Sequence, residues 1–151
     1  MQHTSPLDHY RDLVRGGAVI EDPHQLRAVE LLDCLWHELQ DAGRPGLLRR
    51  MRREQSRPPV CGLYLWGSVG RGKTWLMDLF YDSLPVRQKE RVHFHRFMQR
   101  LHGALKAEGC RKDPLPRIAA RWSSEFRVLC LDEFFVSDIA DAMLLGGLLE
   151  N

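Results

Sequence analysis

The sequence has few of the features that assign a chain to a class at once: paired cysteines, long apolar runs and an excess of one charge. Its four cysteines, Cys34, Cys61, Cys110 and Cys130, are far apart and form no CxxC pair, which favours a reducing compartment over a disulfide framework. No apolar run is long enough for a transmembrane helix, and the first residues do not resemble a signal peptide. With 22 Lys and Arg against 20 Asp and Glu, the net charge is +2 and gives no general reason to expect nucleic-acid or membrane binding. These absences predict a cytoplasmic protein.

The first 43 residues predict a small helical segment. Ser5 before Pro6 is a helix-start signal, and the helix should end at Arg15 because two glycines follow. A second start signal at Asp22-Pro23 opens a run of apolar residues at helical spacing that should end near Gly43.

Residues 44–59 form a basic linker with six arginines and one glutamate, a local net charge of +5. One interpretation is a solvated connector. The other is a contact for an acidic protein, a nucleic acid or anionic lipid headgroups, in which case residues 44–57 would bind a membrane surface peripherally. No aromatic side chain is interleaved to stack on bases, which weakens the nucleic-acid interpretation.

From Val60 onward the pattern predicts strands alternating with helices. The expected strands are Val60–Trp66, Arg91–Phe97 and Arg127–Leu131, and the expected helices are Lys73–Ser83, Met98–Ala107, Asp113–Trp122 and one capped by Ser137. Such alternation is typical of an α/β fold with a parallel sheet and helices on both faces. Cys61 and Cys130 lie in apolar runs and should be small core residues.

A phosphate-binding loop lies between the first expected strand and helix of this core. The GxxxxGK[ST] pattern comprises Gly67, Ser68, Val69, Gly70, Arg71, Gly72, Lys73 and Thr74. Glycines let backbone N–H groups approach phosphate oxygens, and the following helix adds its positive N-terminal end. Lys73 would contact the β- and γ-phosphates and take part in catalysis, while the Thr74 hydroxyl would ligate Mg²⁺. The alternative, a chance glycine turn, is disfavoured by the strand and helix around it.

The third expected strand ends in two acids, Asp132 and Glu133. In phosphate-loop folds the carboxyl ends of the strands line the nucleotide crevice, so Asp132 is predicted to hold Mg²⁺ and Glu133 to activate the attacking water. The pair favours hydrolysis over transfer to a small acceptor, as a phosphotransferase would perform. An ordinary acidic strand end is the alternative.

Histidines and aromatics of the core allow a second hypothesis. His93 and His95 should face one side of a strand, with His102 on the next helix, and two such histidines could begin a zinc site. Without a third ligand at suitable spacing, packing or hydrogen bonding is favoured. Tyr64, Trp66, Trp75 and Phe80 are interpreted as core residues or neighbours of adenine.

Three segments, GLYLWGSVGRGKTWLMDLFYDSLP, RVHFHRFMQRLH and VLCLDEFFVSDIADAMLLGGL, closely resemble the ZapE family of bacterial cell-division ATPases and its mitochondrial relatives. The resemblance implies an AAA+-like P-loop NTPase core over 60–151, with ATP and Mg²⁺ as cofactors. It also implies FtsZ polymers as the protein partner, recruitment to the division site, and a possible homo-oligomer. The mitochondrial relatives are linked to quality control of inner-membrane proteins.

The family pattern continues past Asn151 with a strand that carries a polar sensor and then an arginine-bearing segment. We therefore expect a core that is incomplete at the C-terminus and lacks the strand between its two motif strands. A nucleotide-binding fragment without turnover, or an unfolded remnant, remains an alternative to a working ATPase.

Overall fold

In the computed structural model, the first two helices begin and end where the capping signals predict. Helix α1 (Pro6–Arg15) follows Ser5, whose hydroxyl accepts a hydrogen bond from the Asp8 N–H at 3.2 Å. Helix α2 (Pro23–Gly43) follows Asp22, whose carboxylate accepts from the N–H groups of the first turn. Both helix predictions are therefore confirmed.

The structure describes residues 4–43, 60–109 and 112–150, which divide into two compact units, Met1–Pro85 and Val86–Asn151. The predicted basic linker, 44–59, lies outside the described residues, as does Cys110. No helix in the described ranges is both long and apolar enough to cross a membrane.

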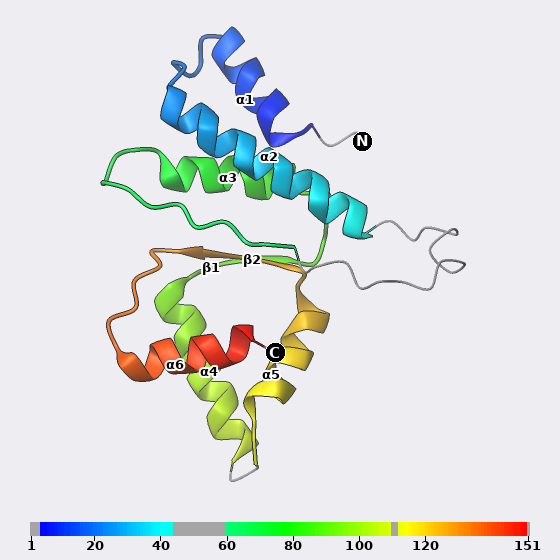
Figure 1. Cartoon of the computed structure of the whole chain (residues 1–151), viewed down its shortest axis with the longest axis vertical. Coiled ribbons are helices and arrows are strands. Elements are labelled where there is room, and N and C mark those ends of the chain that lie inside the picture. The colour runs from blue at the N-terminus through cyan, green and yellow to red at the C-terminus, as the bar shows by residue number, and fades with distance from the viewer. Residues whose placement is uncertain (1–3, 44–59, 110–111, 151) are drawn as a thin grey trace, which may run out of the picture. The chain divides into compact units, whose positions relative to one another are not determined.

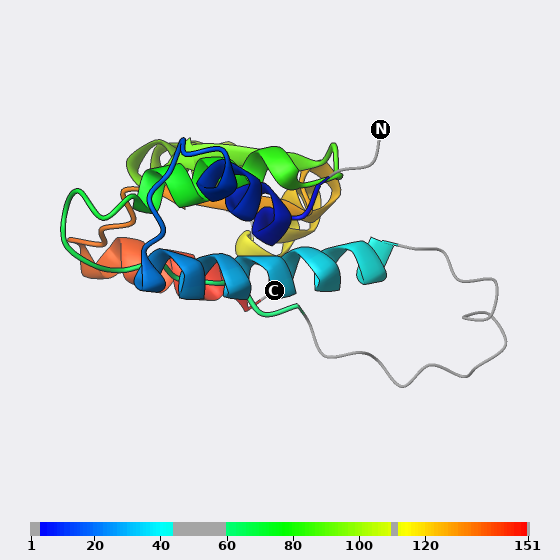
Figure 2. The ribbon, with the colours of Figure 1, turned by 90° about the horizontal axis from the view of Figure 1, so that it is seen from above.

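In the first unit, α1, α2 and α3 (Lys73–Ser83) pack on one another (Figure 1). Figure 2 shows α2 as one unbroken helix. Two polar contacts fasten the helices: the Trp36 indole N–H donates to the Ser83 carbonyl at 2.8 Å, and the Tyr10 hydroxyl accepts from the Asp22 N–H at 3.2 Å. The apolar side chains buried between the helices are Tyr10, Val29, Leu32, Trp36, Leu39, Leu76, Leu79 and Phe80. This packing holds the start of α3, and thus the end of the phosphate loop, against the N-terminal helices.

The segment from Val60 to Trp66 is extended but is not a strand, so that prediction is wrong. A strand requires a hydrogen-bonded neighbour, and in the described part of the chain β1 and β2 pair only with each other. The segment is not buried either: Tyr64 is 64% exposed, Trp66 is 82% exposed, and Cys61 is exposed. Tyr64, Trp66 and Cys61 are therefore not the core residues that the apolar run suggested.

The second unit contains a two-stranded parallel sheet covered by helices. Strands β1 (Lys89–His93) and β2 (Val128–Asp132) pair in the register that sets Arg91 beside Cys130 and His93 beside Asp132. Helices α4 (Phe94–Glu108) and α5 (Leu115–Glu125) form the crossover, and α6 (Ile139–Leu149) follows β2. The predicted parallel sheet with helices is confirmed, whereas helices on both of its faces stay a prediction.

The core of this unit lies between its three helices and the sheet. Val92, Leu129 and Leu131 pack against it from the strands. Its buried members are Phe94, Phe97, Met98, Leu101, Ile118, Trp122, Leu145 and Leu148. Cys130 is buried, as predicted, and burial raises the pKa of its thiol to about 11.

Several predicted boundaries in this unit differ from the structure: α5 begins at Leu115 and ends at Glu125 rather than spanning Asp113–Trp122, and β2 lies one residue later than predicted. The strand expected over Arg91–Phe97 ends at His93, because Phe94, Phe97 and Leu101 recur at helical spacing and are buried as one face of α4. His93 and His95 are therefore not on one strand, although their rings stack with centroids 5.9 Å apart. The last helix is capped by Asp138 rather than Ser137, since the Asp138 carboxylate accepts from the Ala140 N–H at 2.7 Å.

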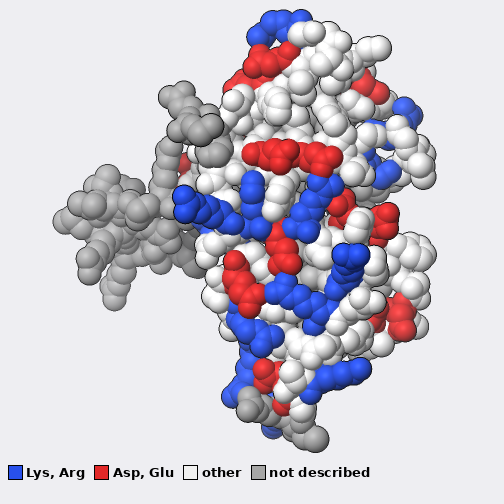
Figure 3. Space-filling view, turned by 180° about the vertical axis from the view of Figure 1, so that it is seen from behind, with Lys and Arg blue, Asp and Glu red and all other residues white. Residues whose placement is uncertain are grey.

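Charged side chains of both signs are mixed on the face shown in Figure 3. In the second unit, Arg100 pairs with Glu90 at 2.8 Å and with Glu125 at 2.5 Å, and its guanidinium lies 4.9 Å from the centre of the Trp122 ring. Among the described residues of the second unit, these pairs neutralise charge locally.

Candidate functional site

The backbone of the phosphate loop takes conformations that favour glycine. Gly70 and Gly72 have φ angles of 82° and 79°, in the left-handed region, and Gly67 has φ 148°. Gly72 is also the N-cap of α3 and supplies no side-chain cap to its first turn. The first N–H groups of α3 are thus presented at the end of a tightly turned loop, the arrangement that binds anions.

Lys73 lies over this loop. Its ammonium donates to the carbonyls of Gly67 and Ser68, both at 2.8 Å. The side chain therefore spans the loop from its last residues back to its first. An ammonium held by two neutral carbonyls keeps its charge close to the position where an anion would approach the N-terminus of α3. Thr74 follows in the first turn of α3 and is exposed.

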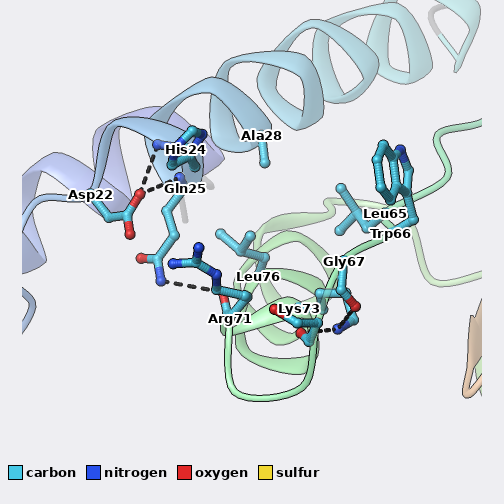
Figure 4. Close-up of a pocket in the computed structure, with 11 residues that line it drawn as sticks. Asp22, His24, Gln25, Ala28, Leu65, Trp66, Gly67, Arg71, Lys73 and Leu76 are labelled. Carbon is cyan, nitrogen blue, oxygen red and sulfur yellow. Dashed lines mark hydrogen bonds between the residues drawn. The ribbon is translucent and has the colours of Figure 1, made fainter.

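A pocket of about 380 Å³ opens beside the loop (Figure 4). One wall comes from the start of α2 and the other from the extended segment and the loop. The residues that line it are Asp22, His24, Gln25, Ala28, Leu65, Trp66, Gly67, Ser68, Arg71, Lys73 and Leu76. Its size lies at the lower end of the range for small-molecule sites, and apolar and cationic side chains meet in it.

The first turn of α2 is joined to the loop. Gln25 points from α2 toward the loop in Figure 4, and its amide N–H donates to the Arg71 carbonyl at 3.4 Å. A Cβ at Gly72 would lie 3.0 Å from the Gln25 amide nitrogen, so the two segments approach closely. Hydrogen bonds from the backbone N–H groups of His24 and Gln25 hold the pKa of Asp22 below its ordinary value, and the charges of His24 and Arg71 act in the same direction.

In the second unit, β2 ends at Asp132 and an ion pair holds the carboxylate of this residue. The Arg91 Nε lies 2.7 Å from the Asp132 Oδ2, and their side chains are 24% and 13% exposed. Because the pair is half-buried, water and salt screen it less than a surface ion pair, and removing one partner costs more stability. Arg91 and Asp132 belong to neighbouring strands, so the parallel register brings them together.

Glu133 follows directly after the strand and differs from Asp132 in backbone conformation, exposure and pairing. Its backbone is left-handed, with φ 52°, although it is not glycine, and its side chain is 79% exposed. The His93 Nδ1 lies 3.9 Å from its carboxylate. Non-glycine residues in this conformation cluster at functional positions, because surrounding structure must offset their strain.

The histidines predicted as possible zinc ligands are not grouped with enough further ligands in the described residues to hold a metal ion. His102 Nε2 lies 2.7 Å from Asp141 Oδ1, a pair between α4 and α6. Within the described residues, no group of three or more His, Cys, Asp or Glu side chains is arranged to hold a metal ion. The zinc hypothesis therefore has no ligand set in this part of the chain.

The structure thus brings the eight residues of the phosphate loop together in the first unit, and the acidic pair lies at the end of β2 in the second. The sequence interpretation missed Gln25 and Arg91. Asp22 was recognised only as a helix start, and its position at the pocket follows from tertiary packing. The alternation in RVHFH is the one sequence signal that predicts Arg91 to lie on a strand.

Comparison with known proteins gives one family. The sequence model of the AFG1-like ATPase family matches residues 4–151. The Escherichia coli K12 protein named cell division protein ZapE is 48% identical over 99% of this chain and 43% of its own length. Lactation elevated protein 1 homolog B of Danio rerio is 42% identical over 96% of this chain and 39% of its own, and an uncharacterized Schizosaccharomyces pombe protein is 34% identical over 98% and 40%. This chain therefore spans about two fifths of these relatives. No solved structure matches it.

Proposed function

Because the chain belongs to the AFG1-like ATPase family, we propose that it binds ATP at residues 67–74 and hydrolyses it in a Mg²⁺-dependent reaction. The observation that carries this proposal is the left-handed loop of Gly70 and Gly72, closed by Lys73 at the uncapped start of α3 and opening into a pocket. Few ligands other than a polyphosphate would use a cation and a row of N–H groups at one point.

The phosphates would replace neutral partners of the loop. Lys73 would exchange the carbonyls of Gly67 and Ser68 for β- and γ-phosphate oxygens, and the flexible four-carbon stem permits this without moving the backbone. Charge-assisted hydrogen bonds to phosphate are stronger than those to carbonyls, so the exchange favours the bound state.

The residues proposed for Mg²⁺ supply the donors that this ion takes. Thr74 offers an exposed hydroxyl, and Asp132 offers a carboxylate of which one oxygen is bound by Arg91. Mg²⁺ prefers oxygen ligands and retains several waters, so one hydroxyl and one carboxylate that acts directly or through water fit its needs. When bound, the ion would neutralise charge on the phosphates.

Glu133 is proposed as the general base: its carboxylate orients the attacking water and accepts the proton that the water loses. Its side chain is 79% exposed, and the His93 Nδ1 lies 3.9 Å from its carboxylate, so the carboxylate is accessible to a water molecule. Asp132 is unsuited to that role, because the Arg91 guanidinium already occupies one oxygen of its carboxylate at 2.7 Å.

The finer features follow the family resemblance. We propose an AAA+-like core over 60–151, with the helical segment 1–43 and the basic linker 44–59 as candidate contacts for a protein partner. The E. coli relative is named a cell division protein, and FtsZ polymers at the division site are the partner proposed here. Cytoplasmic location and homo-oligomerisation of the complete protein belong to the same proposal.

The test is nucleotide binding and phosphate release by the chain and its Lys73→Ala variant. Removing the Lys73 ammonium should weaken binding of a fluorescent ATP analogue at least about tenfold and abolish release of phosphate. The reason is that the variant loses the positive charge that would contact the β- and γ-phosphates. Lys106→Ala, an exposed lysine on α4, is the matched control and should change neither.

Three results would contradict parts of the proposal. Phosphate leaving ATP only when a small acceptor is added would indicate a phosphotransferase. Binding without release would indicate a nucleotide-binding chain without turnover. Equal binding by the parent chain and Lys73→Ala would remove the assignment of the loop itself.

A further inference from the structure

Part of the pocket is lined by the first turns of α2 and by Leu65, and the proposed phosphate chemistry does not use it. We propose that Gln25 reads the purine base there and selects adenine over guanine. This inference rests on the proposed function, because it concerns the same bound nucleotide.

One pocket is lined both by the phosphate loop and by the start of α2. Lys73 and Gly67 line it on the loop side, and Gln25 and Ala28 line it on the α2 side. A nucleotide whose phosphates lie on the loop therefore reaches the α2 wall with its base and sugar. Figure 4 shows Leu65 across from Gln25, so an apolar side chain faces the Gln25 amide.

The walls suit a flat, aromatic ligand. Ala28, Leu65 and Leu76 contribute apolar surface, which favours the faces of a base rather than its polar edge. Among the described residues that line the pocket, Gln25 is the only amide. The polar edge of the base would then meet a side chain that both donates and accepts.

A side chain with both a donor and an acceptor distinguishes adenine from guanine. Adenine presents a donor at N6 and an acceptor at N7, which an amide satisfies with its carbonyl and its N–H together. Guanine presents acceptors at O6 and N7, so the amide carbonyl would face another acceptor. An amide at this place therefore favours ATP, whereas the phosphate loop alone accepts either nucleotide.

Gln25 is held where it can act in this way. Asp22 fixes the helix start through the N–H groups of His24 and Gln25, at 2.7 and 3.2 Å. The side chain is half-buried, and one amide N–H donates to the Arg71 carbonyl. An amide nitrogen carries two N–H groups, so this contact leaves the second N–H and the carbonyl oxygen for a base while it links the base to the loop.

The experiment compares equilibrium binding of ATP, GTP and 7-deaza-ATP to the parent chain, Gln25→Met and Gln25→Ala. Methionine keeps the length of glutamine and removes its hydrogen bonds. We expect the parent to bind ATP at least about tenfold more tightly than GTP, and both variants to lose about tenfold toward ATP with GTP unchanged. The 7-deaza analogue, which lacks the N7 acceptor, should bind more weakly than ATP to the parent but equally to Gln25→Met. Gln40→Met, on the last turn of α2, is the control.

A purely bracing role for Gln25 would lower ATP and GTP binding by the same factor and would overturn the inference, as would no change in either. If Gln25→Met fails to fold by circular dichroism, equal binding of ATP and 7-deaza-ATP to the parent chain overturns it instead. Loss of ATP binding in Lys73→Ala with an unchanged purine preference in Gln25→Met would reject the base reader and retain the ATPase. A parent chain that binds neither nucleotide would reject both.

Discussion

Glu133, whose side chain is 79% exposed, carries a cost that an ordinary loop residue would avoid: a left-handed backbone next to a strand end. A non-glycine residue at φ 52° is disfavoured by about 1 to 2 kcal/mol. Neither hydrophobic burial nor a strong ion pair offsets this, because the nearest partner, His93, is 3.9 Å away. This backbone conformation sets the position of the carboxylate that we propose activates the water.

Glu133→Gln should separate binding from chemistry. The amide keeps the size of the side chain but cannot accept a proton, so we expect ATP binding within about twofold of the parent and phosphate release lowered about 100-fold or more. Isothermal titration and a coupled phosphate assay measure the two. Glu150→Gln, an exposed acid after α6, should leave both unchanged.

A second variant tests whether the loss of phosphate release comes from misfolding rather than from the missing carboxylate. Glu133→Gly removes the carboxylate and relieves the left-handed strain, so it should fold at least as well as the parent and still release no phosphate. Parent-level release by Glu133→Gln would show that another group activates the water.

At the scale of elements, α2 and α3 are joined by a buried hydrogen bond between the Trp36 indole and the Ser83 carbonyl. Ser83 is the last residue of α3, and its hydroxyl donates to the Leu79 carbonyl at 2.7 Å. Because the start of α3 carries the phosphate loop, the contact at its end fixes the orientation of the whole helix.

Trp36→Phe should therefore destabilise the first unit beyond the loss of apolar area. Phenylalanine keeps most of the burial but leaves the Ser83 carbonyl without this donor, a cost of about 1 to 3 kcal/mol in the free energy of unfolding. Urea denaturation followed by circular dichroism measures it. Trp66→Phe is the control, because Trp66 is 82% exposed; equal losses in the two variants would contradict the role given to the hydrogen bond.

The elements that the sequence predicts well are those with local causes. Ser5 and Asp22 cap their helices through hydrogen bonds within three residues, so a short window contains the whole signal. The loop at Gly70 and Gly72 is equally local, because left-handed angles favour glycine wherever the loop lies.

The remaining elements depend on partners far away in the sequence. Val60–Trp66 has the composition of a strand, but a ladder needs a neighbour that composition cannot supply. The sequence predicts a strand that continues to Phe97, because the alternating pattern of a strand and the spacing of a helix coincide over HFHRF. Gln25 and Arg91 act through contacts 46 and 41 residues away, to Arg71 and Asp132, and only the folded chain reveals them.

At the scale of the whole molecule, each compact unit carries one of the two proposed motifs: the phosphate loop before Pro85 and the acidic pair after Val86. The proposal assigns both to one nucleotide, with Mg²⁺ as the group that requires the second motif. The two motifs should then respond differently to ATP with and without the metal, and hydrogen exchange can follow each of them separately.

We expect ATP with EDTA to slow amide exchange in residues 67–76 and at the start of α2, because the phosphates engage the loop and its N–H groups. ATP with Mg²⁺ should add protection at the end of β2, around Asp132 and Glu133, since the ion draws on that carboxylate. At a nucleotide concentration 100 times the Kd, mass action stabilises the bound form by about 2.7 kcal/mol, enough to raise the melting temperature measurably. Lys73→Ala should show neither effect. Protection confined to the first unit under both conditions would contradict the assignment of Asp132 to the metal, while leaving the phosphate loop as a nucleotide site.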